Sequence, residues 1–445
     1  MRKSNLAINI LIVFSISFFT AGSFFTFVEP NLQVRWSQTY SGSGFSRLDS
    51  AQMTSDGGLI MAGFSTGPAY NLSGRSVRPN DIWLQKVDSQ GNLEWSKTYP
   101  STNDSLAFYV EQTSDAGYVI SGITSIPTSV LNISVLLMKV DQNGNEEWNR
   151  TYAGVSSPWE DSVQQTTDGG YILTGGYGVY IIKTYPNGSV QWNRTYQFFI
   201  GSSNNVLQTS DGGYILLGSS YILSQDLPGI LLLKIDASGN PQWNRTIVSS
   251  QYVDSYPSSI QETSDGGYLV SEITHRSLEN NSGTITMGNP QAFLLKLYSN
   301  GTTQWNTTFN ATGWSSGMEA QQTSDGGYIS TVYASWALGY DLWLWKVDAN
   351  GATLWTKPVG GGINVFYVQQ TADGDYMLAG FSNTVSAVLI KVSDTPPLFS
   401  PEVILIMYIA SLDSLVAATV SGIVLYHEPR KEHAKHPKLA SASSK

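Results

Sequence analysis

The sequence contains no cysteine among its 445 residues. Disulfides, cysteine nucleophiles and thiolate metal sites are therefore excluded, and the stability of the fold must come from its core and from the way the chain closes. Charged residues make up only 13% of the chain, and 34 acidic against 24 basic residues give a formal net charge of −10. Because nucleic acid requires a basic footprint, this balance argues against that class of ligand.

Histidine is also scarce. Of the four histidines, His427, His433 and His436 lie in a basic C-terminal tail, and only His275 lies in the body of the chain. A zinc site built on several histidines is therefore excluded, and a Ser-His-Asp triad could form only around that residue. His275 falls in a segment that differs between repeats, where a solvated surface histidine is the expectation. We assign no catalytic residue and no metal ligand from the sequence.

The body of the chain is occupied by a motif that occurs seven times, first as Thr54-Ser55-Asp56-Gly57-Gly58-Leu59. The aspartates of the seven copies are Asp56, Asp115, Asp168, Asp211, Asp265, Asp325 and Asp373. A repeat of roughly 50 residues marks one supersecondary unit that cannot bury its apolar face without its neighbours. An aspartate that recurs in every copy indicates turn chemistry, since an active site needs unlike groups that converge once.

The third copy shows the plan of the unit. Asp161–Thr166 and Tyr171–Gly175 are strand-like runs on either side of an Asp-Gly-Gly turn, and Tyr180–Tyr185 and Val190–Tyr196 flank a Pro-Asn-Gly turn. Asp-Gly and Asn-Gly pairs tolerate the positive φ that tight hairpins need. We therefore predict a four-stranded antiparallel meander, whose strands are called a to d in chain order.

A second motif joins strands c and d and ends in a tryptophan, as in Lys86–Trp95. It occurs six times, because the last repeat stops after its third strand at Lys391-Val392. The missing strand lies at the other end of the chain, where Val34–Tyr40 matches Val190–Tyr196 without strands a to c before it. This offset is typical of a ring closed by its two ends, whereas a linear solenoid carries capping repeats.

The sequence thus predicts an all-β fold, a seven-bladed β-propeller of four-stranded antiparallel blades in which the N-terminal strand closes the last blade. Large aromatic rings at one repeated position are expected to pack between blades. These tryptophans are Trp36, Trp95, Trp148, Trp192, Trp243, Trp305 and Trp355.

The phrase Asp-x-x-Gly-x-x-x-Trp, as in Asp88–Trp95 and Asp348–Trp355, resembles the tryptophan-docking motif of pyrroloquinoline-quinone-type propeller repeats. The whole repeat more closely resembles a group of archaeal and bacterial cell-surface propellers built on Gln-Thr-x-Asp-Gly-Gly-Tyr, over about residues 33–395. The resemblance implies architecture. Quinoprotein dehydrogenases typically have eight blades and an adjacent-cysteine pair, and this chain departs from them in both respects, so we assign no cofactor.

The ends of the chain predict a membrane location. Residues 1–30 contain the apolar run Leu6–Val28 after two basic residues, which is typical of a signal peptide or of an uncleaved N-terminal anchor. The propeller is predicted over residues 31–395, a linker over 396–402 and a transmembrane helix over 403–426. Basic residues follow in 427–445, so we expect a cytoplasmic tail and an extracellular propeller.

One carboxylate, Asp413, interrupts the predicted C-terminal span. A charge at the centre of a membrane helix costs about 2.5–3.5 kcal/mol on insertion scales. Both a tolerated aspartate and a contact with another membrane helix stay open.

Asn-x-Ser/Thr sequons are frequent, as an extracellular domain permits, and each is a candidate glycosylation site. They begin at Asn71, Asn103, Asn132, Asn149, Asn187, Asn193, Asn244, Asn280, Asn300, Asn306 and Asn310. Asp141-Gln142-Asn143-Gly144-Asn145 resembles the start of a calcium loop but lacks the downstream bidentate glutamate.

A candidate binding face follows from the loops. The a–b and c–d turns are short and nearly constant, while the d–a and b–c loops vary and must lie on the opposite face of the ring. The long b–c loops are Ser65–Asp81 and Thr274–Gln291. Aromatic residues outside the repeat positions are expected on this face, either stacking on sugars and protein partners or packing over blade ends. They are Trp159, Phe198, Phe199, Tyr252, Tyr256, Trp314, Trp336 and Tyr340.

The sequence therefore favours a membrane-anchored extracellular propeller that serves as a non-catalytic binding or adhesion module for glycans or envelope proteins. Two alternatives stay open. A quinoprotein-like oxidoreductase would hold a redox cofactor and calcium, and a structural envelope component would self-associate without a soluble ligand.

Overall fold

A computed structural model of the chain describes residues 32–42, 45–72, 75–125, 133–153, 162–175, 179–196, 201–222, 227–247, 252–279, 285–309, 315–336, 339–382 and 386–394. Within these ranges no helix is long and apolar enough to cross a membrane. The predicted N-terminal signal or anchor, linker, transmembrane helix and tail lie outside the described residues.

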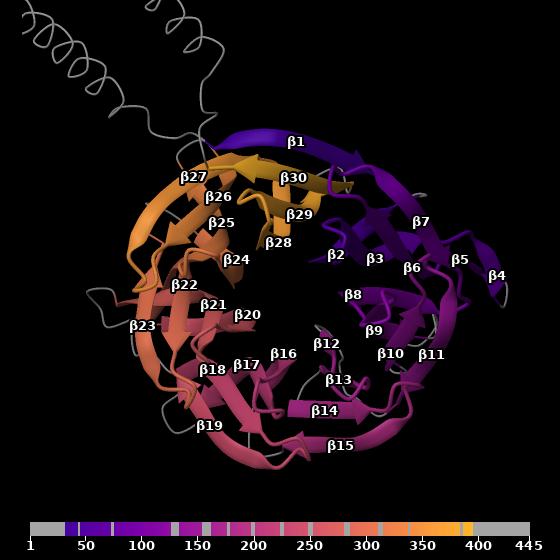
Figure 1. Cartoon of the computed structure of the whole chain (residues 1–445), viewed down its shortest axis with the longest axis horizontal. Coiled ribbons are helices and arrows are strands. Elements are labelled where there is room, and N and C mark those ends of the chain that lie inside the picture. The colour runs from indigo at the N-terminus through magenta and orange to yellow at the C-terminus, as the bar shows by residue number, and fades with distance from the viewer. Residues whose placement is uncertain are drawn as a thin grey trace, which may run out of the picture. The chain divides into compact units, whose positions relative to one another are not determined.

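The described residues form seven four-stranded sheets, arranged as the blades of a ring (Figure 1). Blade 1 contains β2 (Ser46–Met53), β3 (Leu59–Thr66), β6 (Asn80–Val87) and β7 (Leu93–Tyr99). Blade 2 contains β8 (Asp104–Gln112), β9 (Tyr118–Ser125), β10 (Ile133–Val140) and β11 (Glu146–Tyr152). Blade 3 contains β12 (Ser162–Gln165), β13 (Tyr171–Thr174), β14 (Val179–Thr184) and β15 (Val190–Tyr196).

The remaining blades follow the same order. Blade 4 contains β16 (Gly201–Gln208), β17 (Tyr214–Ile222), β18 (Leu227–Ile235) and β19 (Pro241–Ile247). Blade 5 contains β20 (Tyr252–Glu262), β21 (Tyr268–Glu279), β22 (Ile285–Leu297) and β23 (Thr303–Thr308). Blade 6 contains β24 (Ser315–Gln322), β25 (Tyr328–Trp336), β26 (Gly339–Val347) and β27 (Thr353–Gly361). In each blade strand a lies innermost and strand d outermost (Figure 1).

Blade 7 confirms the predicted closure. Its sheet has the order β1-β30-β29-β28, so the N-terminal β1 (Gln33–Tyr40) completes the C-terminal β28 (Ile363–Gln370), β29 (Tyr376–Ser382) and β30 (Ala387–Ser393). The antiparallel register pairs Trp36 with Lys391 and Tyr40 with Ala387. The closure joins strands from opposite ends of the sequence and gives the last blade the same four strands as the others.

The a–b turns show why glycine recurs in the motif. Gly57 has a φ of 81°, and its N–H donates to the carbonyl of Thr54 at 2.8 Å, which closes the turn. Blade 2 departs from the motif, because Ala116 takes the same place with a φ of 65°. It is the single non-glycine residue with positive φ in the described part of the chain, and its Cβ strains that turn.

The repeated tryptophans pack between blades, as expected. Trp95 of blade 1 packs with a tilted ring against Tyr118 of blade 2, with ring centroids 5.9 Å apart. A Cβ on Gly144 in the c–d turn of blade 2 would lie only 2.9 Å from the Trp95 ring, so this glycine lets the indole approach the backbone. Tyr99 of blade 1 donates from its hydroxyl to the Gly144 carbonyl at 2.7 Å. These contacts recur around the ring and join consecutive blades.

Candidate functional site

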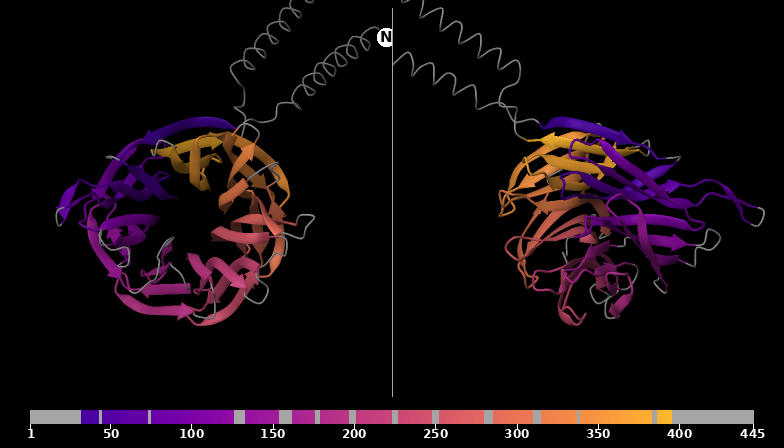
Figure 2. Two further views of the ribbon diagram at one scale, coloured as in Figure 1. Left: turned by 180° about the vertical axis from the view of Figure 1, so that it is seen from behind. Right: turned by 45° about the vertical axis from the view of Figure 1, so that its right-hand side comes forward.

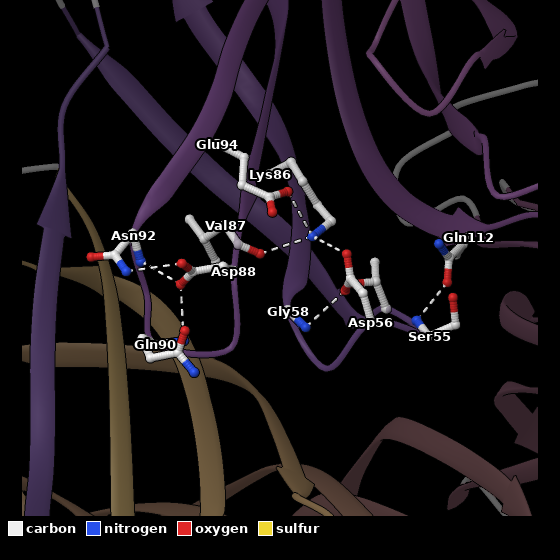
Figure 3. Close-up of polar contacts among 11 residues, drawn as sticks. Ser55, Asp56, Gly58, Lys86, Val87, Asp88, Gln90, Asn92, Glu94 and Gln112 are labelled. Carbon is white, nitrogen blue, oxygen red and sulfur yellow. Dashed lines mark hydrogen bonds and ion pairs between the residues drawn. The ribbon is translucent and has the colours of Figure 1, made fainter.

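The aspartates of the a–b turns hold a buried lysine of strand c (Figure 3). Lys86 Nζ lies 2.9 Å from Asp56 Oδ2 and 3.0 Å from Glu94 Oε2, and only 3% of the lysine side chain is exposed. Partial burial alone would raise the pKa of Asp56, but hydrogen bonds from Thr54, Lys86 and the Gly58 N–H together lower it to about 2. The Asp56 carboxylate is therefore engaged by groups of its own blade.

The same ion pair occurs in every blade, with Nζ–Oδ distances between 2.5 and 3.0 Å. The pairs are Lys86–Asp56, Lys139–Asp115, Lys183–Asp168, Lys234–Asp211, Lys296–Asp265, Lys346–Asp325 and Lys391–Asp373. Turn chemistry predicted the aspartates, but the sequence argument missed their lysine partner, although a lysine recurs at the same place in each c–d motif. Each pair joins the a–b turn to strand c of the same blade.

The aspartates of the c–d turns are likewise occupied. Asp141 Oδ1 accepts from the N–H groups of Asn143 and Asn145, both at 2.8 Å, and Asn145 Nδ2 donates to Oδ2 at 2.8 Å. Asp88 makes the equivalent bonds in blade 1. Within the described ranges no group of three or more histidines and carboxylates could hold a metal ion.

The predicted binding face differs between blades as the loop lengths indicate. The long b–c loop of blade 1 forms a two-stranded hairpin, β4 (Tyr70–Leu72) and β5 (Arg75–Val77), which lies outside the ring (Figure 1). In blade 5, β21 and β22 continue to pair beyond the blade as far as Glu279 and Ile285. The long hairpin arms are also visible in the turned views (Figure 2). Two b–c connections are therefore built out as β-structure on the same rim.

The structure places only part of the predicted aromatic set. Tyr256 lies in β20 and is 50% exposed. The backbone register puts Trp336 opposite Gly339 and Tyr340 opposite Ser335 at the b–c end of blade 6. Tyr252 begins β20, and the side chains of Tyr252, Trp336 and Tyr340 are outside the described part. Trp159, Phe198, Phe199 and Trp314 lie outside the described residues. The aromatic binding face therefore stays a prediction.

The sequons fall in three groups. Asn149, Asn193, Asn244 and Asn306 are exposed on the outer strands, and Asn187 and Asn300 are exposed in c–d turns. Asn103 is half-buried, and Asn71 lies in β4. Asn132, Asn280 and Asn310 lie outside the described residues.

Near the a–b turns, the inner strands are joined by glutamine side chains. Gln112 Oε1 of blade 2 accepts from the Ser55 N–H of blade 1 at 2.7 Å (Figure 3). Equivalent bonds join Gln165 to Ser114, Gln208 to Thr167, Glu262 to Ser210, Gln322 to Ser264 and Gln370 to Ser324. At the closure Met53 occupies this place, and its N–H donates to the Tyr367 hydroxyl at 2.9 Å instead. The residue before the threonine of the motif, a glutamine in five blades and Glu262 in blade 5, is therefore an inter-blade contact.

A second set of amides lies one residue earlier on the same strands. Gln52 Oε1 accepts from the Gln112 N–H at 2.5 Å, Gln164 from Gln208 at 2.5 Å, and Gln261 from Gln322 at 2.7 Å. Glu111 takes this role in blade 2, accepting from the Gln165 N–H at 3.3 Å. Each bond joins one blade to the next.

Blades 6 and 7 depart from this pattern. Gln321 Nε2 makes a long contact of 3.5 Å with Glu319 Oε1 on its own strand, and Gln369 Oε1 accepts from the Tyr367 hydroxyl, also on its own strand. Where blades 1, 3 and 5 have a serine, blade 6 has Glu319 and blade 7 has Tyr367. Gln321, which would join blade 6 to blade 7, and Gln369, which would join blade 7 to blade 1, are thus turned within their own strands.

A cavity of about 330 Å³ opens where the pattern is interrupted. Its lining comes from the inner strands and a–b turns of blades 5, 6 and 7: Gln261, Gln321, Gln322, Ser324, Gln369, Gln370, Thr371, Ala372 and Gly374. Five of these nine residues are glutamines, and none is ionisable or aromatic. The sequence did not reveal this site, because the inner-strand glutamines recur in the repeat and their positions alone do not show where the contacts are interrupted.

Two carboxyl groups of the inner strands lie within the ring. Burial raises the pKa of Glu319 to about 8, although a hydrogen bond from Gln321 acts to lower it. Burial also raises the pKa of Glu111 to about 8. Burial, with the charges of Glu111 and Glu319 nearby, also raises the pKa of Tyr109. These groups come from blades 2 and 6, so the inner strands bring them into one environment.

No family model matches this sequence, and no curated protein matches it. Among solved structures, a polysaccharide lyase, an ulvan lyase bound to -[GlcA(1-4)Rha3S]-, has a TM-score of 0.50 at 8% identity, covering 80% of this chain and 95% of its own. The WD40 domain of Pan2 from Neurospora crassa has a TM-score of 0.49 at 10% identity, covering 82% of this chain and 96% of its own. At these identities the likeness concerns the β-propeller fold alone.

Proposed function

We propose that this protein is a membrane-anchored extracellular recognition module. Its variable b–c face binds glycans or envelope proteins without catalysing a reaction. One observation carries the proposal: the two faces of the ring differ. The a–b turns repeat the same hydrogen bonds in all seven blades, whereas b–c connections are built out as hairpins in blades 1 and 5. Variation confined to the loops of one face of a rigid scaffold is typical of a binding surface.

The use of the charged residues supports a non-catalytic role. The repeated aspartates are engaged by buried lysines or by the backbone of their own turns. A general acid and base must meet at one place with a reactive group between them, and a carboxylate bonded in the same way in seven blades does not have that geometry.

The membrane location rests on the sequence, through the apolar run of 403–426 and the basic residues after it. Exposed sequons support an extracellular propeller. Asn187 and Asn300 are the best placed, because each stands in an exposed c–d turn. Asn187 Oδ1 accepts from the Ser189 hydroxyl and Asn300 Oδ1 from the Thr302 hydroxyl, both at 2.7 Å. We propose that the exposed asparagines of the outer strands and turns carry glycans.

The test is a glycan array, together with binding to cells, probed with the full-length chain. In one variant a two-residue turn replaces the hairpin Tyr70–Val77, and in a second Tyr256 is changed to alanine. The control is Ser238→Ala in a c–d turn of the opposite face. We expect the face variants to lose binding at least tenfold while keeping their melting temperature, and the control to bind as the wild type does. Equal binding by all variants would exclude the b–c face.

A thermal-shift screen separates the two alternatives, since a ligand that binds only the native state raises the melting temperature. A rise with pyrroloquinoline quinone plus calcium would indicate a quinoprotein-like oxidoreductase. If the chain self-associates and binds neither a glycan nor a cell surface, the result would indicate a structural envelope component.

A further inference from the structure

A ring built from seven copies of one unit should repeat its contacts at every step between blades. The inner-strand amides do so from blade 1 to blade 2, from blade 3 to blade 4 and from blade 5 to blade 6. Gln321, at the step from blade 6 to blade 7, and Gln369, at the step from blade 7 to blade 1, turn to groups of their own strands, and the amide-lined cavity opens beside both side chains. An interruption of the repeat that coincides with a cavity is where a ring of structural copies can acquire a ligand.

We propose that this cavity, lined by the glutamines of blades 5, 6 and 7, is a second binding site and that its ligand is a neutral saccharide. It lies at the a–b turns, opposite the b–c face, so it is independent of the site proposed above. Failure at one site leaves the other standing.

The amide orientations define what the cavity offers. Gln261 Oε1 accepts from the Gln322 N–H at 2.7 Å, and Gln322 Oε1 accepts from the Ser264 N–H at 2.8 Å. Since a backbone N–H can only donate, the oxygen end of each amide is assigned by the network and the Nε2 end is left over. In the described part of the chain, the Nε2 groups of Gln261, Gln322 and Gln369 have no acceptor. The cavity therefore presents amide donors. Bonds to a neighbouring blade hold those of Gln261 and Gln322 in place, and a bond within its own strand holds that of Gln369.

Acceptors for a ligand are also present. Gln321 uses its Nε2 toward Glu319, which leaves Oε1 as an acceptor, and Ser324 adds a hydroxyl that both donates and accepts. Sugar hydroxyls also donate and accept, so they match a lining in which amide NH₂ groups, an amide oxygen and a hydroxyl stand side by side. A saccharide is the ligand class whose polar groups this set can satisfy together.

Charge excludes the main alternatives. The lining has no lysine or arginine to bind a phosphate or carboxylate. It also has no carboxylate of its own to ligate a cation. With no aromatic ring in the lining, recognition must rest on hydrogen bonds and not on stacking.

The size and rigidity of the cavity fit a small ligand. About 330 Å³ is near the lower end of the range for small-molecule sites. The lining is carried on strand ends and turns that inter-blade hydrogen bonds hold in position, so little ordering is needed on binding. We expect recognition of one or two sugar units.

The test uses saturation-transfer NMR and calorimetry on the full-length chain in a detergent without a sugar headgroup. The probes are glucose, galactose, mannose, rhamnose, N-acetylglucosamine and their simple disaccharides. The main variant is Gln321→Leu. Leu207 occupies the same repeat position in blade 4, so the ring accepts leucine there, and Gln321 makes no inter-blade bond that the change would remove.

Gln164→Leu is the matched control, with the same substitution at the same repeat position in blade 3, outside the cavity. We expect at least one neutral probe to bind the wild type, Gln321→Leu to weaken it about 2- to 10-fold, as loss of a hydrogen bond predicts, and Gln164→Leu to leave it unchanged. Removal of the Tyr70–Val77 hairpin should also leave it unchanged.

Three outcomes would overturn the inference: no neutral probe binds the wild type, Gln321→Leu binds as tightly as the wild type, or only the hairpin variant loses binding. The last outcome would support the b–c face and reject the cavity. Preferential binding of acetate or phosphate would reject the neutral ligand class.

Discussion

Replacing Asp265 with asparagine should lower the free energy of unfolding by about 2 kcal/mol. The change keeps an oxygen for the turn bonds from Thr263 and Gly267 but removes the countercharge of Lys296, whose side chain is 1% exposed. Lys296 Nζ lies 2.9 Å from Asp265 Oδ2. Between effective dielectric constants of about 80 and 20, two unit charges at that distance attract by about 1.4–5.7 kcal/mol. Since the Asp265 side chain is 53% exposed, solvent screens the pair and the lower half of that range applies.

Blade 1 supplies a matched control within the same molecule. Lys86 has a second carboxylate, Glu94 Oε2, at 3.0 Å, whereas the ion pair of Lys296 is with Asp265. Asp56→Asn should therefore cost under about 1 kcal/mol, because the buried ammonium keeps a countercharge. The measurement is urea unfolding of the full-length chain, followed by tryptophan fluorescence. Equal costs for the two substitutions would refute the argument that these buried lysines depend on their countercharge.

The pH dependence gives an independent check. The folded pKa of Asp265 is lowered from 3.8 to about 2, so its contribution to stability is complete above pH 3.8 and is lost as the pH falls through 2. Asp265→Asn should remove that part of the acid-induced loss of folding stability and leave the part due to other groups.

Other consequences can be measured on the same chain. Ala116→Gly should raise the free energy of unfolding by about 1 kcal/mol by relieving a positive φ, and Gly266→Ala should lower it by a similar amount, although nothing lies within 4 Å of the added Cβ; equal melting temperatures would contradict this. Burial raises the folded pKa of Glu319 from 4.5 to about 8, so wild-type stability should fall as the pH rises from 4.5 through 8. Glu319→Gln should flatten that part of the pH profile and stabilise the protein at neutral pH, whereas an unchanged slope would place the titration elsewhere.

Local chemistry made the blade predictable from sequence. The a–b turn needs a residue with positive φ, as at Gly57. The strand before it alternates polar and apolar residues and the strand after it is rich in strand formers, so each blade can be recognised from a few neighbouring residues. The closure was predictable for a different reason. Val34–Tyr40 carries the pattern of a fourth strand without its blade, and the register of β1 with β30 confirms the partner.

The candidate sites were less predictable, because they depend on contacts between distant residues. Lys296 and Asp265 are 31 positions apart, and no turn rule requires that pair. Gln321 and Gln164 stand at the same repeat position, yet one joins two blades and the other does not. The departures at Glu319 and Leu207 were visible in the sequence as exceptions at the inner-strand positions, but their meaning depended on which neighbour each one faces.

The sequence by itself determined the seven-bladed ring, because turn, strand and tryptophan positions recur locally and the offset ends require closure. Only the tertiary structure decided which polar side chains are hydrogen-bonded within the protein and which remain available to a ligand. The hydrogen bonds between Gln164 and Gln208 and between Gln261 and Gln322 join residues 44 and 61 positions apart, and their partners depend on how whole sheets pack. The amide-lined cavity is the result of that packing, since it opens where two inner strands satisfy their side chains within themselves.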